Sequence, residues 1–153
     1  EQLYELGLCV VTQPNFIKER GDAYIENVPM SEHSFLYRTN SLIRSGVPVA
    51  FGTDMPFGRP DPWAAMRAAT ERTTLNGVTI NDEERITPEK ALQGFLGGLA
   101  SPCSVRAIRP GTTADCCLLD LPWKELKTNL SSEHVRFTIR EGEIIYSRNK
   151  DGV

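Results

Sequence analysis

Residues 49–63, VAFGTDMPFGRPDPW, run from a short apolar stretch to a single acidic residue and then into a proline-rich turn. An uninterrupted apolar stretch bounded by turn residues is typical of a strand buried on both faces, as in a parallel sheet. A second such stretch, LGLCVVTQP at residues 6–14, stands earlier in the chain. We therefore expect residues 8–13 and 48–52 to form adjacent parallel strands.

Polar residues lie at the carboxyl end of both expected strands. Asp54 comes just past the end of the second strand, after Thr53, and Gln13 is the last residue of the first. In parallel α/β folds, ligands bind beyond the carboxyl ends of the strands. A carboxylate there can bind a metal, orient a water molecule or act as a general base. Asp54 can also cap the turn through its own backbone, and both interpretations stay open at this point.

Helix signals alternate with the strands. Residues 14–30 are polar and interrupted by prolines and a glycine, so we expect them to be irregular. Three capping residues predict helix starts: Ser31, Asp61 before Pro62, and Thr87 before Pro88. The first of these helices is expected to end at Gly46 and the second at Gly77. The pattern is therefore βαβα over the first two thirds of the chain.

The last third has a different character. ADCCLLDL at residues 114–121 predicts a short strand, and VRFTIREGEIIYS at residues 135–147 predicts two strands joined at Glu141-Gly142. We expect two domains, one over residues 1–104 and one over residues 105–153.

Length and charge limit the class of protein. The 153 residues suffice for one ordinary domain, and the net charge of -3 without a Lys/Arg cluster argues against nucleic-acid binding. No apolar run approaches the roughly 20 residues of a membrane-spanning helix, and the acidic start lacks the basic region of a signal peptide. We expect a cytoplasmic protein with no membrane or nucleic-acid partner. Because Met is not the first residue, we expect an excised piece or a partial reading frame.

The cysteines predict neither a zinc ribbon nor a redox motif. None of the four forms a CxxC pair; they are Cys9, Cys103, Cys116 and Cys117. We expect all of them to be small buried hydrophobic residues in a reducing compartment.

Three segments in this order resemble the C-terminal part of the amidohydrolase superfamily: GVPVAFGTDMPFGRPDPWAAMRAAT, ERITPEKALQGF and RPGTTADCCLLD. The branch is amidohydrolase family 3, which includes enzymes like N-substituted formamide deformylase and D-aminoacylase. The resemblance implies an α/β fold: the C-terminal part of a metal-dependent-hydrolase (β/α)₈ barrel with strands seven and eight, plus part of a small β-sandwich.

The resemblance also implies a site. Asp54 matches the aspartate after the eighth barrel strand, which binds the metal and carries a proton from the attacking water to the leaving group. The expected cofactor is a divalent metal, with zinc favoured and iron or manganese left open. The family's other ligands include histidines, but His33 and His134 lack partners at ligand spacing, and we expect both to be surface or capping residues.

Three further candidates come from their position and chemistry, and two residues come from the resemblance. Gln13 would line the site, and Arg38 and Arg59 are candidates for binding a substrate carboxylate, although an arginine near a turn is more often a solvated surface group. Gly111 and Asp115 match residues that shape a turn.

The resemblance thus implies a C-terminal fragment of a metal-dependent amidohydrolase, which would hydrolyse an amide- or formamide-type C–N bond of a small molecule with metal-activated water. Because a complete barrel needs about 250 residues, we expect the chain alone to be inactive. Two alternatives remain: a non-catalytic module that associates with itself, and one half of a split enzyme that another chain completes.

Overall fold

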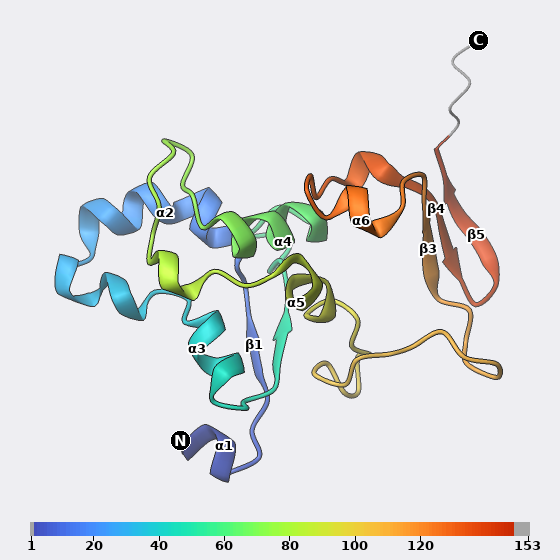
Figure 1. Ribbon diagram of the computed structural model, residues 1–153, viewed down its shortest axis with the longest axis horizontal. Helices are drawn as coiled ribbons and strands as arrows, with labels where there is room; N and C mark the ends of the chain where they lie inside the picture. The colour runs from blue at the N-terminus through green and yellow to red at the C-terminus, as the bar shows by residue number, and fades with distance from the viewer. Residues whose placement is uncertain (1, 149–153) are drawn as a thin grey trace. The chain divides into compact units, whose positions relative to one another are not determined.

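The computed structural model describes residues 2–148, which form two compact units: one through Arg106 and one from Ala107 onward (Figure 1). The first unit contains, in chain order, α1 (Gln2–Glu5), β1 (Val10–Thr12), α2 (Asn15–Asn27), the 3₁₀ helix η1 (Met30–Phe35), α3 (Thr39–Arg44), β2 (Val49–Phe51), α4 (Pro62–Glu71), the 3₁₀ helix η2 (Asp82–Glu84) and α5 (Pro88–Gln93).

The two apolar stretches form a parallel pair of strands, as predicted. β1 pairs with β2 in a register that joins Val10 to Val49 and Thr12 to Phe51. The pairing continues past the strands, since the Gly52 N–H donates to the Thr12 carbonyl at 3.0 Å. The two carboxyl ends therefore lie at the same edge of this small sheet.

Helices supply the core of the first unit. α2 packs against α4, α4 packs against α5, and α3 contacts β2. The buried side chains on these elements include Ile17, Trp63, Ala65, Met66 and Ala91. The apolar face of α4 thus packs into the core, as its spacing predicts.

Both predicted proline-initiated helices begin where the capping residues place them. The Asp61 carboxylate accepts hydrogen bonds from the N–H groups of Trp63 at 2.9 Å and Ala64 at 3.2 Å. The Thr87 hydroxyl accepts from the Lys90 N–H at 3.3 Å. The expected end of α4 at Gly77 was wrong, because the chain turns into the left-handed region earlier, at Arg72 with φ 53°.

The expectation of irregular structure over residues 14–30 was wrong, because residues 15–27 form α2. Its glycine is a packing residue. A Cβ on Gly21 would lie 2.6 Å from Cγ2 of Thr74 and 3.0 Å from Cδ1 of Ile80. Gly21 thus lets α2 approach the segment after α4, and tertiary contact overrides the low helix propensity of glycine.

We expect Gly21→Ala to destabilise the protein by about 1–2 kcal/mol. The overpacking against the fully buried Thr74 outweighs the gain in helix propensity. Urea denaturation measures the free energy of unfolding. Gly98→Ala is the control, since a Cβ at Gly98 would meet nothing within 4 Å. Stabilisation by Gly21→Ala would contradict the close packing.

The helix expected from Ser31 to Gly46 is divided in two. η1 ends at Phe35, and Tyr37 takes a left-handed φ of 50° before α3 begins at Thr39. The predicted end at Gly46 is confirmed by its φ of 76°. The apolar spacing continues across this break, so periodicity alone did not reveal it.

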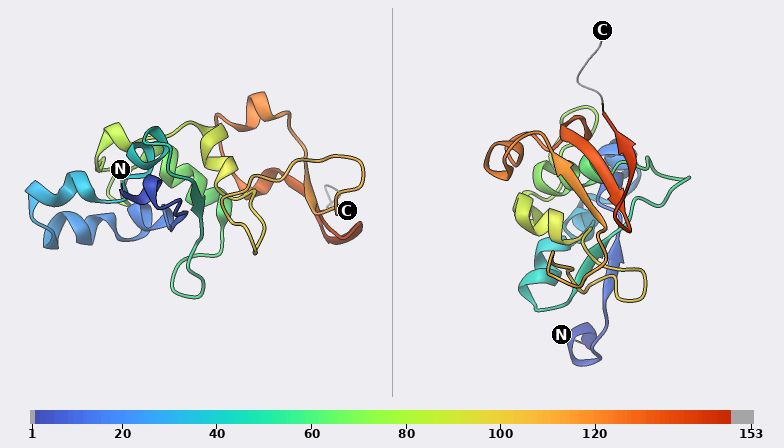
Figure 2. Two further views of the ribbon diagram at one scale, coloured as in Figure 1. Left: turned by 90° about the horizontal axis from the view of Figure 1, so that it is seen from below. Right: turned by 90° about the vertical axis from the view of Figure 1, so that its right-hand side faces the viewer.

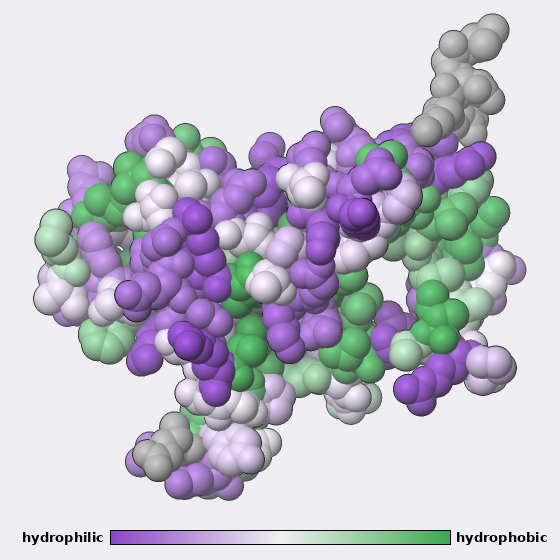
Figure 3. Space-filling model, viewed as in Figure 1, coloured by the Kyte–Doolittle hydropathy of each residue, from purple (hydrophilic) through white to green (hydrophobic). Residues whose placement is uncertain are grey.

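The second unit is a three-stranded antiparallel sheet with the order β3-β4-β5. It comprises β3 (Cys116–Leu119), α6 (Trp123–Leu126), the 3₁₀ helix η3 (Ser132–His134), β4 (Val135–Arg140) and β5 (Glu143–Ser147). The predicted strands and their hairpin at Glu141-Gly142 are confirmed. Every residue of β5 is exposed, and Figure 3 shows hydrophobic residues gathered over this sheet.

Of the two turn residues in this unit, Asp115 acts through its side chain and Gly111 through its backbone conformation. The Asp115 carboxylate accepts from the Glu141 N–H at 2.8 Å, and Gly111 adopts φ 85°. Asp115 therefore ties the start of β3 to the hairpin between β4 and β5.

The expectation for the cysteines was wrong. Cys9 and Cys103 form a disulfide across a sequence separation of 94, with their Cα atoms 6.3 Å apart. Cys116 and Cys117 are free, the first half-buried and the second exposed. Spacing along the chain did not reveal the pair, because the fold brings the two residues together. Disulfides persist mainly in oxidising compartments, so cysteine usage no longer supports a cytoplasmic location.

Of the helices formed by residues 2–148, none has the length and apolar character that crossing a bilayer requires.

Candidate functional site

Asp54 lies three residues beyond β2, in a tight turn. Its φ is 58°, and its carbonyl oxygen accepts from the N–H groups of Phe57 at 2.8 Å and Gly58 at 2.9 Å. The backbone rather than the side chain thus closes the turn. The carboxylate is left exposed, and among residues 2–148 no hydrogen bond or ion pair engages it. Asp54 can therefore accept a proton or bind a cation without first breaking a contact.

The start of α2 holds this turn. The buried Asn15 donates through Nδ2 to the Thr53 carbonyl at 3.1 Å and to Oε1 of Glu19 at 3.2 Å. The Glu19 carboxylate in turn accepts from the Arg59 N–H at 3.3 Å and 3.4 Å. The two residues thus bind the chain immediately before Asp54 and again five residues after it.

The turn is also closed by packing. A Cβ on Gly58 would lie 2.1 Å from the Thr53 carbonyl oxygen and 2.6 Å from Nδ2 of Asn15, so only glycine fits there. The Arg20 guanidinium lies 3.8 Å from the ring centroid of Phe57 and 4.8 Å from that of Phe16. Cation–π stacking therefore ties the far side of the turn to α2. Figure 2 shows the loop between β2 and α4, coloured green, extending away from the helices.

The other predicted site residues divide into two groups. Gln13 directly follows β1 and therefore lies at the same sheet edge as the end of β2, and Arg59 belongs to the loop that carries Asp54. Arg38 lies between η1 and α3, with its guanidinium 5.7 Å from the ring centroid of Phe35. Within residues 2–148, no described contact joins Arg38 to Gln13, Asp54 or Arg59.

The described residues do not fit a complete metal centre. In residues 2–148 there is no group of three or more His, Cys, Asp or Glu side chains arranged to hold a metal. A catalytic zinc takes three protein ligands and a water. The carboxylate of Asp54 suits a single ligand position and no more.

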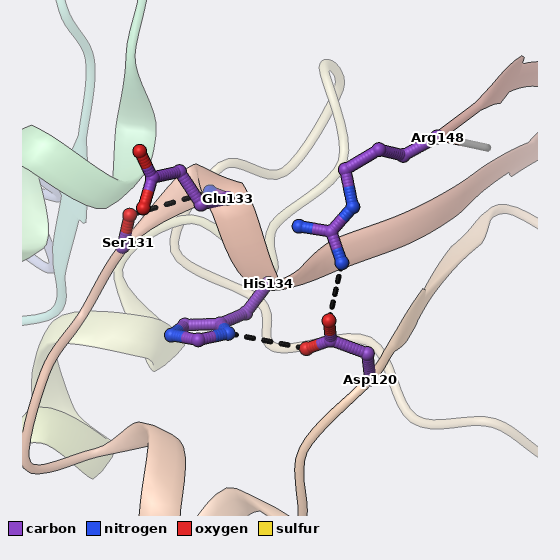
Figure 4. Close-up of polar contacts among 5 residues, drawn as sticks. All are labelled: Asp120, Ser131, Glu133, His134 and Arg148. Carbon is purple, nitrogen blue, oxygen red and sulfur yellow. Dashed lines mark hydrogen bonds and ion pairs between the residues drawn. The ribbon is translucent and has the colours of Figure 1, made fainter. Parts of the chain in front are cut away.

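Both histidines are half-buried and bond to nearby groups; His33 acts as the expected capping residue, whereas His134 belongs to a side-chain cluster. Nε2 of His33 lies 2.8 Å from the Val28 carbonyl oxygen at the end of α2. In the second unit, Nδ1 of His134 lies 3.1 Å from Oδ1 of Asp120, and Arg148 binds the other oxygen of that carboxylate (Figure 4). This cluster joins the residue after β3 to the residue before β4 and to the end of β5.

Residues 2–146 match the amidohydrolase family. An N-substituted formamide deformylase from Arthrobacter pascens is 27% identical over 96 residues, which are 62% of this chain and 18% of that enzyme.

Two solved structures are also similar. An uncharacterized metal-dependent hydrolase from Pyrococcus horikoshii OT3 has a TM-score of 0.54 and 26% identity, over 61% of this chain and 20% of that one. An uncharacterized metal-dependent hydrolase from Pyrococcus furiosus has a TM-score of 0.49 and 30% identity, over 60% and 18%.

The parallel strand pair, the acid beyond it and the match over nearly all of the described residues define the class of protein. The chain belongs to the amidohydrolase family, as the resemblance of its motifs predicted. Its mixed α/β structure agrees with an amidohydrolase fold. The chain spans about a fifth of the length of the relatives described above.

Sequence reasoning missed Asn15, Glu19 and the disulfide. Asn15 and Glu19 are separated by four positions and therefore share one face of α2. The four-residue spacing is visible in the sequence, but it indicates a shared face only if the segment is helical. We expected residues 14–30 to be irregular. Their contacts reach 38 and 40 residues along the chain, which only the fold reveals.

Proposed function

We propose that the chain is the C-terminal part of a metal-dependent amidohydrolase that hydrolyses an amide- or formamide-type C–N bond in a small molecule. The observation that carries the proposal is the unengaged carboxylate of Asp54 at the carboxyl end of a parallel strand pair, in a chain that matches the amidohydrolase family over residues 2–146. The bond type is suggested by the similar N-substituted formamide deformylase.

Asp54 is the proposed catalytic residue. Its exposed carboxylate would accept a proton from the attacking water and deliver it to the leaving nitrogen. When bound, a divalent metal, with zinc favoured, would supply the activation of that water. The chain's own contribution is one ligand and one proton acceptor, because the described residues do not assemble a full ligand set.

The architecture is proposed on the same basis. β1 and β2 would be strands seven and eight of a (β/α)₈ barrel, and the sheet β3-β4-β5 would belong to a small β-sandwich. The parallel pairing and the antiparallel sheet in a separate compact unit are compatible with this assignment. Residues 1–104 and 105–153 remain the proposed domains.

Substrate contacts are proposed for Gln13 and Arg59, which share the sheet edge and loop of Asp54, and for Arg38. The guanidinium of either arginine would pair with a carboxylate on the substrate.

A cytoplasmic location of the protein likewise remains a proposal.

We expect the 153-residue chain by itself to hydrolyse no amide and to hold no zinc tightly. A single carboxylate is a weak zinc site compared with a set that includes imidazole or thiolate ligands. The test is amide turnover together with metal content, measured on the isolated chain and on a full-length protein that contains it. Amide hydrolysis by the isolated chain would contradict the proposal, and so would a full-length protein without C–N hydrolase activity.

The two alternative functions, a self-associating module and one half of a split enzyme, would give different results when the same samples are measured. A self-associating module would be oligomeric by light scattering and inactive at every length, and exposed strand edges such as β5 favour association. A split enzyme would become active only when a second polypeptide is added.

A further inference from the structure

We propose that Asn15 is a positioning residue for Asp54, acting with Glu19 to fix the turn that presents the catalytic carboxylate. This inference rests on the proposed function for its catalytic consequence. Its structural part rests on the contacts between α2 and residues 53–59 alone.

The turn that carries Asp54 lacks regular structure of its own. It lies between β2 and α4, and its internal hydrogen bonds run from Phe57 and Gly58 to the Asp54 carbonyl. Asp54 adopts φ 58°, in the left-handed region that few non-glycine residues other than aspartate and asparagine occupy. The direction of its carboxylate therefore depends on what holds the two ends of the turn.

Helix α2 holds both ends of the Asp54 turn through one connected set of hydrogen bonds. Nδ2 of Asn15 bonds to the Thr53 carbonyl, on the residue directly before Asp54, and to Glu19. Glu19 then binds the Arg59 N–H, next to Gly58. Removing Nδ2 of Asn15 releases the Thr53 carbonyl and takes away the bond that links Glu19 to this end of the turn, which leaves Glu19 bonded to the Arg59 N–H.

The side chain of Asn15 is not the choice that would make the fold most stable. Its side chain is 2% exposed, and its Oδ1 has no hydrogen-bond partner among residues 2–148. A buried acceptor without a donor costs stability, and such groups in folded proteins call for an explanation. Exchanging the amide's oxygen and nitrogen would not help, because an oxygen would then face the Glu19 carboxylate and the Thr53 carbonyl. The geometry is explained if the site needs both bonds from Nδ2.

The decisive variant is Asn15→Asp in a full-length protein that contains this chain. The shape is kept, but the donor is replaced by an acceptor that faces two other oxygens. Hydrogen exchange at the N–H groups of Phe57 and Gly58 is expected to accelerate at least about tenfold, since the turn loosens. With an N-substituted formamide as probe, kcat is expected to fall about 10- to 100-fold while KM changes less than about twofold.

Three further variants complete the experiment. Asn27→Ala is the matched control, because Asn27 lies on the same helix and its Nδ2 donates to the Ala23 carbonyl within that helix. Glu19→Ala, at a half-buried position, is expected to accelerate exchange at Arg59 and lower kcat, and it serves if Asn15→Asp does not fold. Glu19→Gln keeps an acceptor oxygen. Its exchange rate at Arg59 and its kcat are therefore expected to lie close to those of the unsubstituted protein.

The outcomes separate this inference from the proposed function. Asp54→Asn is expected to lower kcat without changing loop exchange. The positioning role would be overturned if hydrogen exchange in the turn were unchanged in both Asn15→Asp and Glu19→Ala. It would also be overturned if kcat were unchanged in both variants. If the unsubstituted full-length protein hydrolyses no C–N bond, the proposed function is wrong, whereas the exchange rates still decide whether Asn15 holds the turn.

Discussion

Replacing Asp54 with asparagine in a full-length protein that contains this chain is expected, on the proposed role of Asp54, to lower turnover about 10²–10⁴-fold while leaving the fold intact. The amide cannot accept the proton from water, and a general base contributes about that factor. The fold survives because asparagine, like aspartate, tolerates the left-handed conformation, which Asp54 occupies with φ 58°. Turnover of an N-substituted formamide and the urea denaturation midpoint are the two measurements.

Asp61→Asn is the matched control for this experiment. Asp61 carries the same chemical group on the same loop, but its carboxylate caps α4. Asparagine caps a helix about as well as aspartate, so both turnover and stability should stay near those of the unsubstituted enzyme. Near-full turnover in Asp54→Asn would show that Asp54 serves only the turn, through its carbonyl oxygen.

The second large effect concerns stability and is expected at Arg72. This side chain is 0% exposed, and its guanidinium donates to the carbonyl oxygens of Ile80 at 2.8 Å, Leu36 at 2.9 Å and Tyr37 at 3.0 Å. Burial lowers the pKa of Arg72 to about 10, and the nearby Glu84 carboxylate partly offsets this, so the group remains charged at neutral pH. Arg72 thus links the end of α4 to the chain between η1 and α3.

We expect Arg72→Met to reduce the free energy of unfolding by about 2–4 kcal/mol. The methionine keeps an unbranched stem but leaves the Leu36 and Ile80 carbonyls without this donor, and each buried unpaired group costs about 1–3 kcal/mol. The loss is limited because the cost of burying the charge also disappears. Urea denaturation measures it, with the exposed Arg44→Met as control. A change below about 1 kcal/mol would mean that water replaces the guanidinium.

Local patterns predicted the parts of the fold that local chemistry determines. The apolar runs around Val10 and Val49 gave the parallel pair, and the Asp61-Pro62 and Thr87-Pro88 signals marked two helix starts. Asp54 was placed beyond its strand by the same reasoning. Each of these depends on residues within a few positions of one another.

The parts that sequence reasoning missed depend on distant residues. α2 forms although it contains Gly21, because that glycine admits Thr74 and Ile80. The break at Tyr37 coincides with the carbonyls that Arg72 binds from 35 and 36 residues away. The pairing of Cys9 with Cys103 and the contact of Asn15 with Thr53 likewise arise only after the elements have packed.

The disulfide between Cys9 and Cys103 closes residues 9–103 into a covalent ring, from which residues 1–8 extend on one side and a longer tail, residues 104–153, on the other. Both strands and the Asp54 turn lie within the ring, whereas every residue of the sheet β3-β4-β5 lies in the tail. One peptide-bond cleavage after Cys103 frees the tail, but one cleavage in the exposed turn at residues 54–57 only opens the ring and leaves a single molecule. A protease must therefore cut twice to remove Asp54 from its scaffold, unless a reductant acts first.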